Sequence, residues 1–160
     1  MELNCKSSTG RGTTFEFIFR GVGANPAPRP APKREVAPKV GGVVFLVDDE
    51  ELVRRGTRRM LKLLGAEVHE FGSAGEALAR LEAGVVPDLL LTDLAMPEMD
   101  GLALAQEVKR RWPGVRVAVI SGDPNREAAL AAAGVIKVLL KPFEAKELGD
   151  LLTQVLSRPA

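Results

Sequence analysis

The chain has 160 residues, of which 46% are hydrophobic and 27% charged, so it can bury one substantial core but not two. A net charge of +1 provides no concentrated field for nucleic acid or an anionic membrane, and neither is expected as a partner. The single cysteine, Cys5, cannot form an internal disulfide, and no long apolar run or signal-peptide pattern is present, which favours the reducing cytoplasm.

The first 40 residues contain a short strand pattern followed by a proline-rich segment. Over residues 13–20, Phe15, Phe17 and Phe19 alternate at a period of two, which predicts a strand with one aromatic face and no pairing partner nearby. Residues 21–40 hold five of the eleven prolines, separated by alanine and basic residues. This composition predicts an extended linker, so we place the domain boundary there.

Short apolar runs alternate with helical patterns over residues 41–158. The predicted strands cover residues 43–47, 66–70, 89–92, 115–120 and 135–140. The first predicted helix ends at Gly65. The second is capped by Ser73 and Glu76 and ends near Gly84, and the third begins at Asp100 and Gly101. The last two cover residues 127–133 and 145–156. Each strand is therefore followed by a helix, five times over.

This alternation predicts an α/β domain with a parallel sheet and helices on both of its faces. Residues 43–47 and 89–92 are almost wholly apolar, as central strands are, whereas residues 66–70 are half polar and belong at an edge. The flavodoxin-like (βα)5 arrangement with strand order 2-1-3-4-5 satisfies both conditions. In such sheets the functional site lies beyond the carboxyl ends of the central strands.

Chemically active side chains follow four of the five predicted strands: Asp48, Asp49 and Glu50 after the first, Asp93 after the third, Ser121 after the fourth and Lys141 after the fifth. Aspartates that converge on one crevice repel each other, so the cluster favours a bound cation. Oxygen ligands without a cysteine or histidine cluster favour Mg²⁺ over zinc. A lysine and a hydroxyl beside an aspartate nucleophile suit a phosphoryl group, so we interpret Asp93 as the attacking carboxylate.

Four segments resemble the receiver domain of two-component response regulators and hybrid histidine kinases: "VVFLVDDEELVR", "LLLTDLAMPEMDG", "VAVISGD" and "VLLKPFEAKEL". They occur in that family's order and spacing, and the resemblance covers residues 43–157. It implies a phosphoacceptor in a phosphorelay, loaded from a phosphohistidine donor and emptied by slow self-catalysed hydrolysis. The implied partner is a histidine kinase or a histidine phosphotransfer protein, with output by protein contact or onward phosphotransfer, and a homodimer is possible.

The resemblance also implies roles for individual residues. Asp93 is the expected phosphoacceptor. The expected Mg²⁺ ligands are Asp48, Asp49, Asp93 and the backbone carbonyl of Ala95. Ser121 corresponds to the family's switch hydroxyl, and Lys141 to the lysine that contacts the phosphoryl group. The bond between Lys141 and Pro142 is expected to be cis, as it is in the family.

Two positions depart from the family pattern. Ala95 replaces the polar residue or methionine that many receivers carry beside the site, which puts the rates of phosphorylation and dephosphorylation in question. Val138 replaces the usual tyrosine or phenylalanine whose rotamer follows the phosphorylation state. We therefore expect coupling from the site to run through Ser121 and its loop.

The segment "STGRGTTFEFIF", residues 8–19, resembles the last glycine turn and strand of the ATP-binding domain of histidine kinases. The only histidine, His69, falls inside the receiver-like region, so this chain is not expected to work as a kinase. We interpret residues 1–20 as a remnant of such a domain and the chain as the carboxyl-terminal part of a hybrid kinase. Without its sheet, the aromatic face should be exposed. An unrelated extension is the alternative.

Simpler interpretations remain open at several positions. Asp49 could be only a helix cap, and Asp100 is interpreted as one. His69 is assigned no chemistry, and the arginines of the first helix, Arg54, Arg55, Arg58 and Arg59, are interpreted as a solvated face.

Two alternative functions remain open. One is an aspartate-based small-molecule phosphatase of the haloacid dehalogenase type, a family that has a second aspartate at the position of Ala95. The other is a scaffold that is never phosphorylated.

Overall fold

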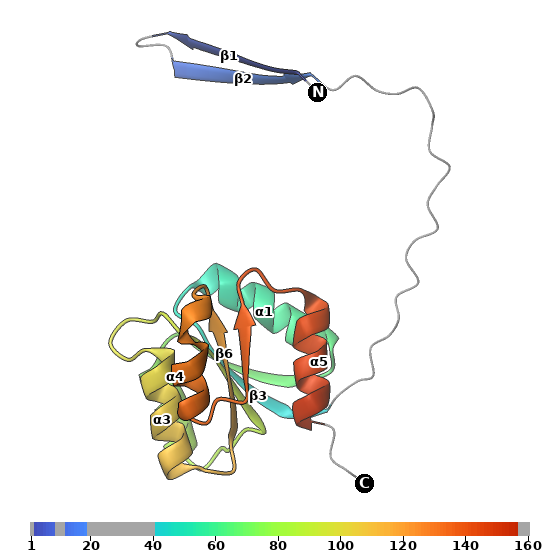
Figure 1. Ribbon diagram of the computed structural model, residues 1–160. Coiled ribbons are helices and arrows are strands. Elements are labelled where there is room, and N and C mark those ends of the chain that lie inside the picture. The colour runs from blue at the N-terminus through green and yellow to red at the C-terminus, as the bar shows by residue number, and fades with distance from the viewer. Residues whose placement is uncertain (1, 9–11, 19–40, 157–160) are drawn as a thin grey trace. The chain divides into compact units, whose positions relative to one another are not determined.

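A computed structural model describes residues 2–8, 12–18 and 41–156 of the chain (Figure 1). The chain divides into two compact units, Met1–Glu35 and Val36–Ala160. The predicted linker over residues 21–40 lies outside the described residues. Among the helices that are described, none combines the length and the apolar character needed to cross a bilayer.

The amino-terminal unit is a two-stranded antiparallel sheet. Strand β1 (Glu2–Ser8) pairs with β2 (Gly12–Ile18), and Cys5 lies opposite Phe15. The prediction that the aromatic strand has no partner nearby is therefore wrong. Strand β1, "ELNCKSS", is mostly polar, and its period-two alternation rests on only two apolar residues, Leu3 and Cys5, which is too short a pattern to predict a strand. The predicted exposure of the phenylalanine side chains lies outside what the structure describes.

The second unit has a five-stranded parallel sheet in the order β4-β3-β5-β6-β7. Its strands are β3 (Val43–Val47), β4 (Glu67–Phe71), β5 (Leu89–Asp93), β6 (Arg116–Ser121) and β7 (Lys137–Leu140). Its helices are α1 (Glu51–Leu63), α2 (Ala74–Glu82), α3 (Gly101–Arg111), α4 (Glu127–Ala132) and α5 (Ala145–Leu156), and a 3₁₀ turn, η1 (Pro124–Arg126), precedes α4. The predicted flavodoxin-like order 2-1-3-4-5 is confirmed, and the half-polar β4 lies at the edge.

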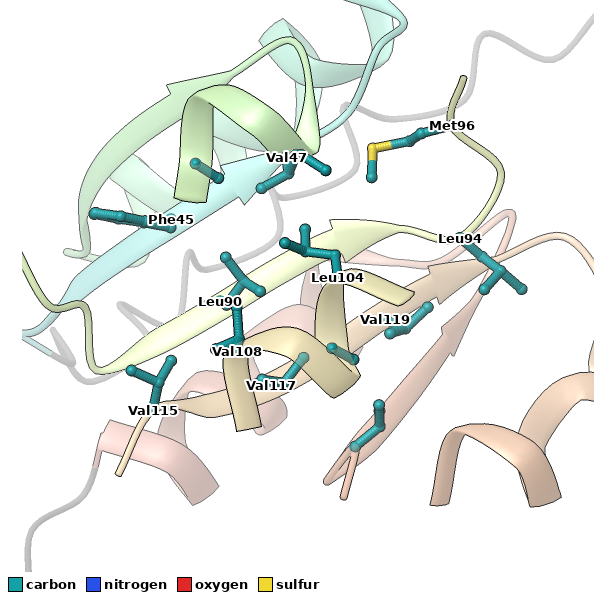
Figure 2. Close-up of a cluster of buried hydrophobic side chains, with 14 of the residues drawn as sticks. Phe45, Val47, Leu90, Leu94, Met96, Leu104, Val108, Val115, Val117 and Val119 are labelled. Carbon is teal, nitrogen blue, oxygen red and sulfur yellow. The ribbon is translucent and has the colours of Figure 1, made fainter. Parts of the chain in front are cut away.

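Two hydrophobic clusters cover the two faces of the sheet. One joins alternate residues of the strands to α2, α3 and α4, with Leu90, Val117 and Val119 of the central strands directed toward Leu104 of α3 (Figure 2). The other packs the opposite faces of the same strands against α1 and α5. All five residues of β5 are buried, because this strand has neighbours on both edges and helices over both faces.

The predicted helix starts are confirmed where a side-chain cap was expected. The hydroxyl of Ser73 accepts a hydrogen bond from the Glu76 amide at 3.3 Å, and Asp100 Oδ1 accepts one from the Ala103 amide at 2.8 Å. Strand β7 begins two residues later than predicted, at Lys137. The Val135 amide donates to the Leu130 carbonyl and closes α4, whereas the Ile136 amide already donates to the Val117 carbonyl of β6.

Gly101, the first residue of α3, packs directly against the end of β5. A β-carbon added there would overlap the Asp93 carbonyl oxygen and lie 3.0 Å from the Leu94 α-carbon. We predict that Gly101→Ala lowers the free energy of unfolding by about 1–3 kcal/mol, the usual range for overpacking. Urea unfolding of the full chain, followed by circular dichroism, measures this change.

Gly56→Ala is the matched control, because Gly56 lies exposed within α1 and its added β-carbon meets nothing within 4 Å. It should raise the free energy of unfolding by about 1 kcal/mol through helix propensity alone. Equal effects of the two substitutions would show that the close packing at Gly101 is not needed.

Candidate active site at the strand ends

Three carboxylates converge at the carboxyl ends of β3 and β5. Asp48, Asp49 and Asp93 each place one oxygen so that the three oxygens lie within 4.8 Å of one another. The side chains of Asp48 and Asp93 are buried, whereas Asp49 is exposed. The predicted acidic cluster is therefore present, with one of its three members facing solvent.

Asp93 is held by the most buried strand of the sheet. It is the last residue of β5 and lies opposite Ile120 of β6. The next residue, Leu94, donates its amide to the Ile120 carbonyl and accepts the Gly101 amide, both at 2.9 Å. The backbone on each side of Asp93 is thus fixed by the sheet and by the start of α3, which leaves its carboxylate a narrow range of positions.

Lys141 lies on the other side of the Asp93 carboxylate. Its Nζ is 2.7 Å from Asp93 Oδ1, and its amide donates to the Ser121 carbonyl at 2.8 Å. Burial by itself lowers the pKa of Lys141, but the hydrogen bond to Asp93 and the charges of Asp93 and Asp48 outweigh burial, so the pKa is raised. Lys141 is consequently a firmly protonated partner for an anion, and its bond to Pro142 is cis, as predicted.

One carboxylate oxygen of Asp48 has no hydrogen-bond partner among the residues that the structure describes. Its Oδ1 accepts the Glu50 amide at 2.8 Å, but the buried Oδ2 is unpaired. Burial raises the pKa of the Asp48 carboxyl above its usual value, and the charges of Asp93 and Asp49 raise it further. A buried, unpaired carboxylate oxygen beside two more carboxylates is a donor set that fits a divalent cation with oxygen ligands such as Mg²⁺.

Ser121 is the last residue of β6, and Ala95 lies two residues after the end of β5. The buried Ser121 hydroxyl donates to the Asp123 carbonyl and accepts the Asp123 amide, each at 2.9 Å, so it is bound to its own loop. Ala95 lies exposed in the loop after Asp93. The strand ends thus bring Asp48, Asp49 and Asp93 together and place Lys141 against Asp93, while the Ser121 hydroxyl is bound to the Asp123 backbone.

One contact at the site was missed by reasoning from sequence. Arg54 Nη1 donates to the backbone carbonyl of Asp48 at 2.6 Å. The four arginines of α1 were interpreted together as a solvated face, and for Arg54 this interpretation is incomplete. Arg54 is three residues beyond the first turn residue of α1, Glu51, so its guanidinium can reach back to the preceding strand end. The six-residue separation of Arg54 from Asp48 in the sequence is the signal that could have predicted this contact.

Comparison with known proteins places these residues in a wider context. Residues 44–153 match the family described as the response regulator receiver domain. The sensor kinase CckA of Brucella abortus is 34% identical over 167 residues, covering 98% of this chain and 18% of the relative. The DNA-binding transcriptional regulator NtrC of Salmonella typhimurium is 36% identical over 118 residues, covering 72% of this chain and 25% of the relative.

Solved structures share the same fold. A response regulator receiver domain protein from Clostridium thermocellum superposes with a TM-score of 0.68 at 25% identity, covering 72% of this chain and 94% of that one. The chain therefore matches almost the whole of a separate receiver structure, but it spans only a quarter or less of the length of these two curated relatives.

The unpaired, buried carboxylate of Asp48 should cost stability when no cation is present. We predict that Asp48→Asn raises the free energy of unfolding at neutral pH in EDTA by about 1 kcal/mol, because it removes a charge that is disfavoured first by burial and then by the charges of Asp93 and Asp49. Asp49→Asn, which removes an exposed charge from the same cluster, is the control and should have a smaller effect.

The pH dependence follows from the direction of the Asp48 pKa shift. Since the folded-state pKa lies above the ordinary value of 3.8, the ionised carboxylate is disfavoured in the folded chain. The gain in unfolding free energy from Asp48→Asn should be absent below pH 3.8. It should grow as the pH rises from 3.8 to the raised folded-state pKa, and stay constant above it. Thermal melts between pH 3 and 8 measure this, and a lower melting temperature for Asp48→Asn at neutral pH would contradict it.

Proposed function

This chain belongs to the response regulator receiver domain family, and from that premise we propose that it accepts a phosphoryl group on Asp93 from a phosphohistidine donor. The observation that carries the proposal is the contact of Lys141 Nζ with Asp93 Oδ1 at 2.7 Å, inside a crevice that also holds Asp48 and Asp49. A protonated lysine beside a buried carboxylate binds the negative charge of an incoming phosphoryl group.

Mg²⁺ is the proposed cofactor. Asp48, Asp49 and Asp93 would hold it, together with the backbone carbonyl of Ala95, and the unpaired Asp48 Oδ2 supports this assignment. When bound, the ion supplies positive charge that neutralises the oxygens of the phosphoryl group during transfer.

The proposed transfer needs little covalent chemistry from the protein. An Asp93 carboxylate oxygen attacks phosphorus as the phosphorus–nitrogen bond of the donor phosphohistidine breaks, and the imidazole leaves with the bonding electron pair and takes up a proton. Lys141 then exchanges its contact with Asp93 for one with a phosphoryl oxygen. The buried end of β5 keeps the attacking oxygen in place, which supplies the positioning that such reactions depend on.

Signalling is proposed to run through Ser121. Its hydroxyl leaves the Asp123 backbone and donates to a phosphoryl oxygen, which draws the loop between β6 and α4 toward Asp93. Val138 lies in β7 and packs against the cluster under α2, α3 and α4, so no aromatic side chain takes part from that position. Hydrolysis of the aspartyl phosphate at a rate set partly by Ala95 returns the loop to Asp123.

We also propose that the chain is part of a hybrid histidine kinase in the cytoplasm. The similarity to the sensor kinase CckA covers 98% of this chain, whereas the similarity to NtrC covers 72%. The kinase similarity thus extends over the residues before the receiver domain, where "STGRGTTFEFIF" resembles the end of an ATP-binding domain. The proposed partners are a histidine kinase or phosphotransfer protein, and a second copy in a homodimer.

Phosphorylation should depend on Asp93 and on Mg²⁺. We predict that acetyl phosphate with Mg²⁺ adds one hydroxylamine-labile phosphoryl group to the full chain, detected by intact-mass spectrometry, and that beryllofluoride raises its melting temperature. Both effects should be lost in Asp93→Asn and in EDTA. Rapid turnover of small phosphate esters would support a phosphatase instead, and no response from a folded chain would support a scaffold.

Ser121→Ala separates phosphoryl uptake from switching. The variant retains Asp93 and Lys141 and should still form the labile adduct. Its amide resonances over residues 122–126 should shift less on phosphorylation than those of the unchanged chain, as measured by two-dimensional NMR. Equal shifts in both proteins would remove Ser121 from the switching role.

The hybrid-kinase proposal predicts the size of the protein in the cell. An antibody raised against residues 41–156 should detect a polypeptide several times larger than the 17.1 kDa of this chain. Detection of a band only near 17 kDa in the source cells would contradict the proposal, while leaving the phosphoacceptor function untouched.

A further inference from the structure

Arg54 differs from the other arginines of α1 in what its guanidinium contacts. Arg55 pairs with Glu51 at 3.6 Å, with both side chains about two-thirds exposed, and Arg58 pairs with Glu70 at 3.1 Å. Arg54 is half-buried, and its Nη1 donates to the Asp48 carbonyl at 2.6 Å. Arg54 therefore contacts the end of β3, where the carboxylates of Asp48 and Asp49 lie close to Asp93.

Three hydrogen bonds hold the turn that carries Asp48. The Asp48 amide donates to the Phe71 carbonyl at 3.2 Å, its Oδ1 accepts the Glu50 amide at 2.8 Å, and its carbonyl accepts Arg54 Nη1. The first two bonds use backbone donors. Arg54 provides the only one of the three that a substitution outside the acidic residues can remove.

The guanidinium also lies beside the neighbouring loop. A β-carbon added to Gly72 would be 3.8 Å from Arg54 Nη1 and 3.8 Å from Glu76 Oε2, and that Glu76 oxygen accepts the Gly72 amide at 2.8 Å. The Arg54 guanidinium therefore lies near the loop after β4 while it donates to the turn after β3. The hydrogen bond from its planar guanidinium to the Asp48 carbonyl restricts rotation of the peptide between Asp48 and Asp49.

We propose that Arg54 is a positioning residue for the cation site: by holding the Asp48 carbonyl, it fixes the peptide from which the Asp48 and Asp49 carboxylates project. The inference rests on the proposed function, because it assumes that these carboxylates bind Mg²⁺. Without Arg54, the Asp48 carbonyl loses this hydrogen bond and the peptide can rotate, so the two carboxylates no longer start from one preset geometry. Loss of such supporting partners typically weakens metal affinity about 10–100-fold.

Arg54→Met tests the proposal, because methionine keeps much of the aliphatic stem of arginine and removes its hydrogen-bond donors. Titration calorimetry of the full chain with Mg²⁺ should show an affinity at least about 10-fold below that of the unchanged chain. Arg54→Lys, which retains a donor, should recover part of the loss. Arg55→Gln, on the same helix with an exposed partner, is the control and should bind Mg²⁺ normally.

A second readout separates positioning from a general loss of structure. In acetyl phosphate assays, Arg54→Met should need more Mg²⁺ for half-maximal phosphorylation but approach the normal rate when Mg²⁺ is saturating. Arg54→Gln, whose amide is too short to reach the Asp48 carbonyl, replaces the methionine variant if that variant does not fold in EDTA.

Two results would overturn the inference in distinguishable ways. If the unchanged chain binds Mg²⁺ and the folded Arg54 variants bind it within twofold, Arg54 has no positioning role and the proposed function stands. If the unchanged chain neither binds Mg²⁺ nor becomes phosphorylated, the proposed function and this inference fail together.

Discussion

The contact between Lys141 and Asp93 is the interaction on which the rest of the site depends. It joins the ends of two strands, β5 and β7, that are separated in the sheet by β6, so it forms only if all three strands are parallel and in register. The fully buried β5 and the close approach of Gly101 to Asp93 fix one end of the contact. The bond from the Lys141 amide to the Ser121 carbonyl fixes the other.

The acidic cluster works against the stability of this arrangement. Asp48 is fully buried with one oxygen unpaired, and its raised pKa shows that the folded chain disfavours its charge. The Glu50 amide and the positive charge of Lys141 offset only part of that cost. A cation would supply the missing interaction, so the instability of the free site would be the counterpart of the proposed affinity for Mg²⁺.

Reasoning from sequence succeeded where one local pattern was sufficient. The apolar run before Asp93 predicted a central strand, the half-polar run around His69 predicted an edge strand, and Ser73 and Asp100 predicted caps, because each depends on neighbouring residues. It failed where the determining contact lay outside the local pattern. Strand β1 is too polar to be recognised without its partner β2, and the contact of Arg54 with Asp48 is invisible to a pattern that sorts arginines by helical face.

The proposed switch at Ser121, in a chain that has valine at position 138, would depend on a small energy difference. Its two hydrogen bonds to the Asp123 backbone are each worth about 1 kcal/mol net, and water can replace them when the loop moves. A hydrogen bond to a phosphoryl oxygen is charge-assisted and roughly twice as strong as a neutral one. In the proposed exchange, the hydrogen bonds lost and gained would nearly balance, so the loop would populate both positions when Asp93 is phosphorylated and would return to Asp123 when the phosphoryl group is lost.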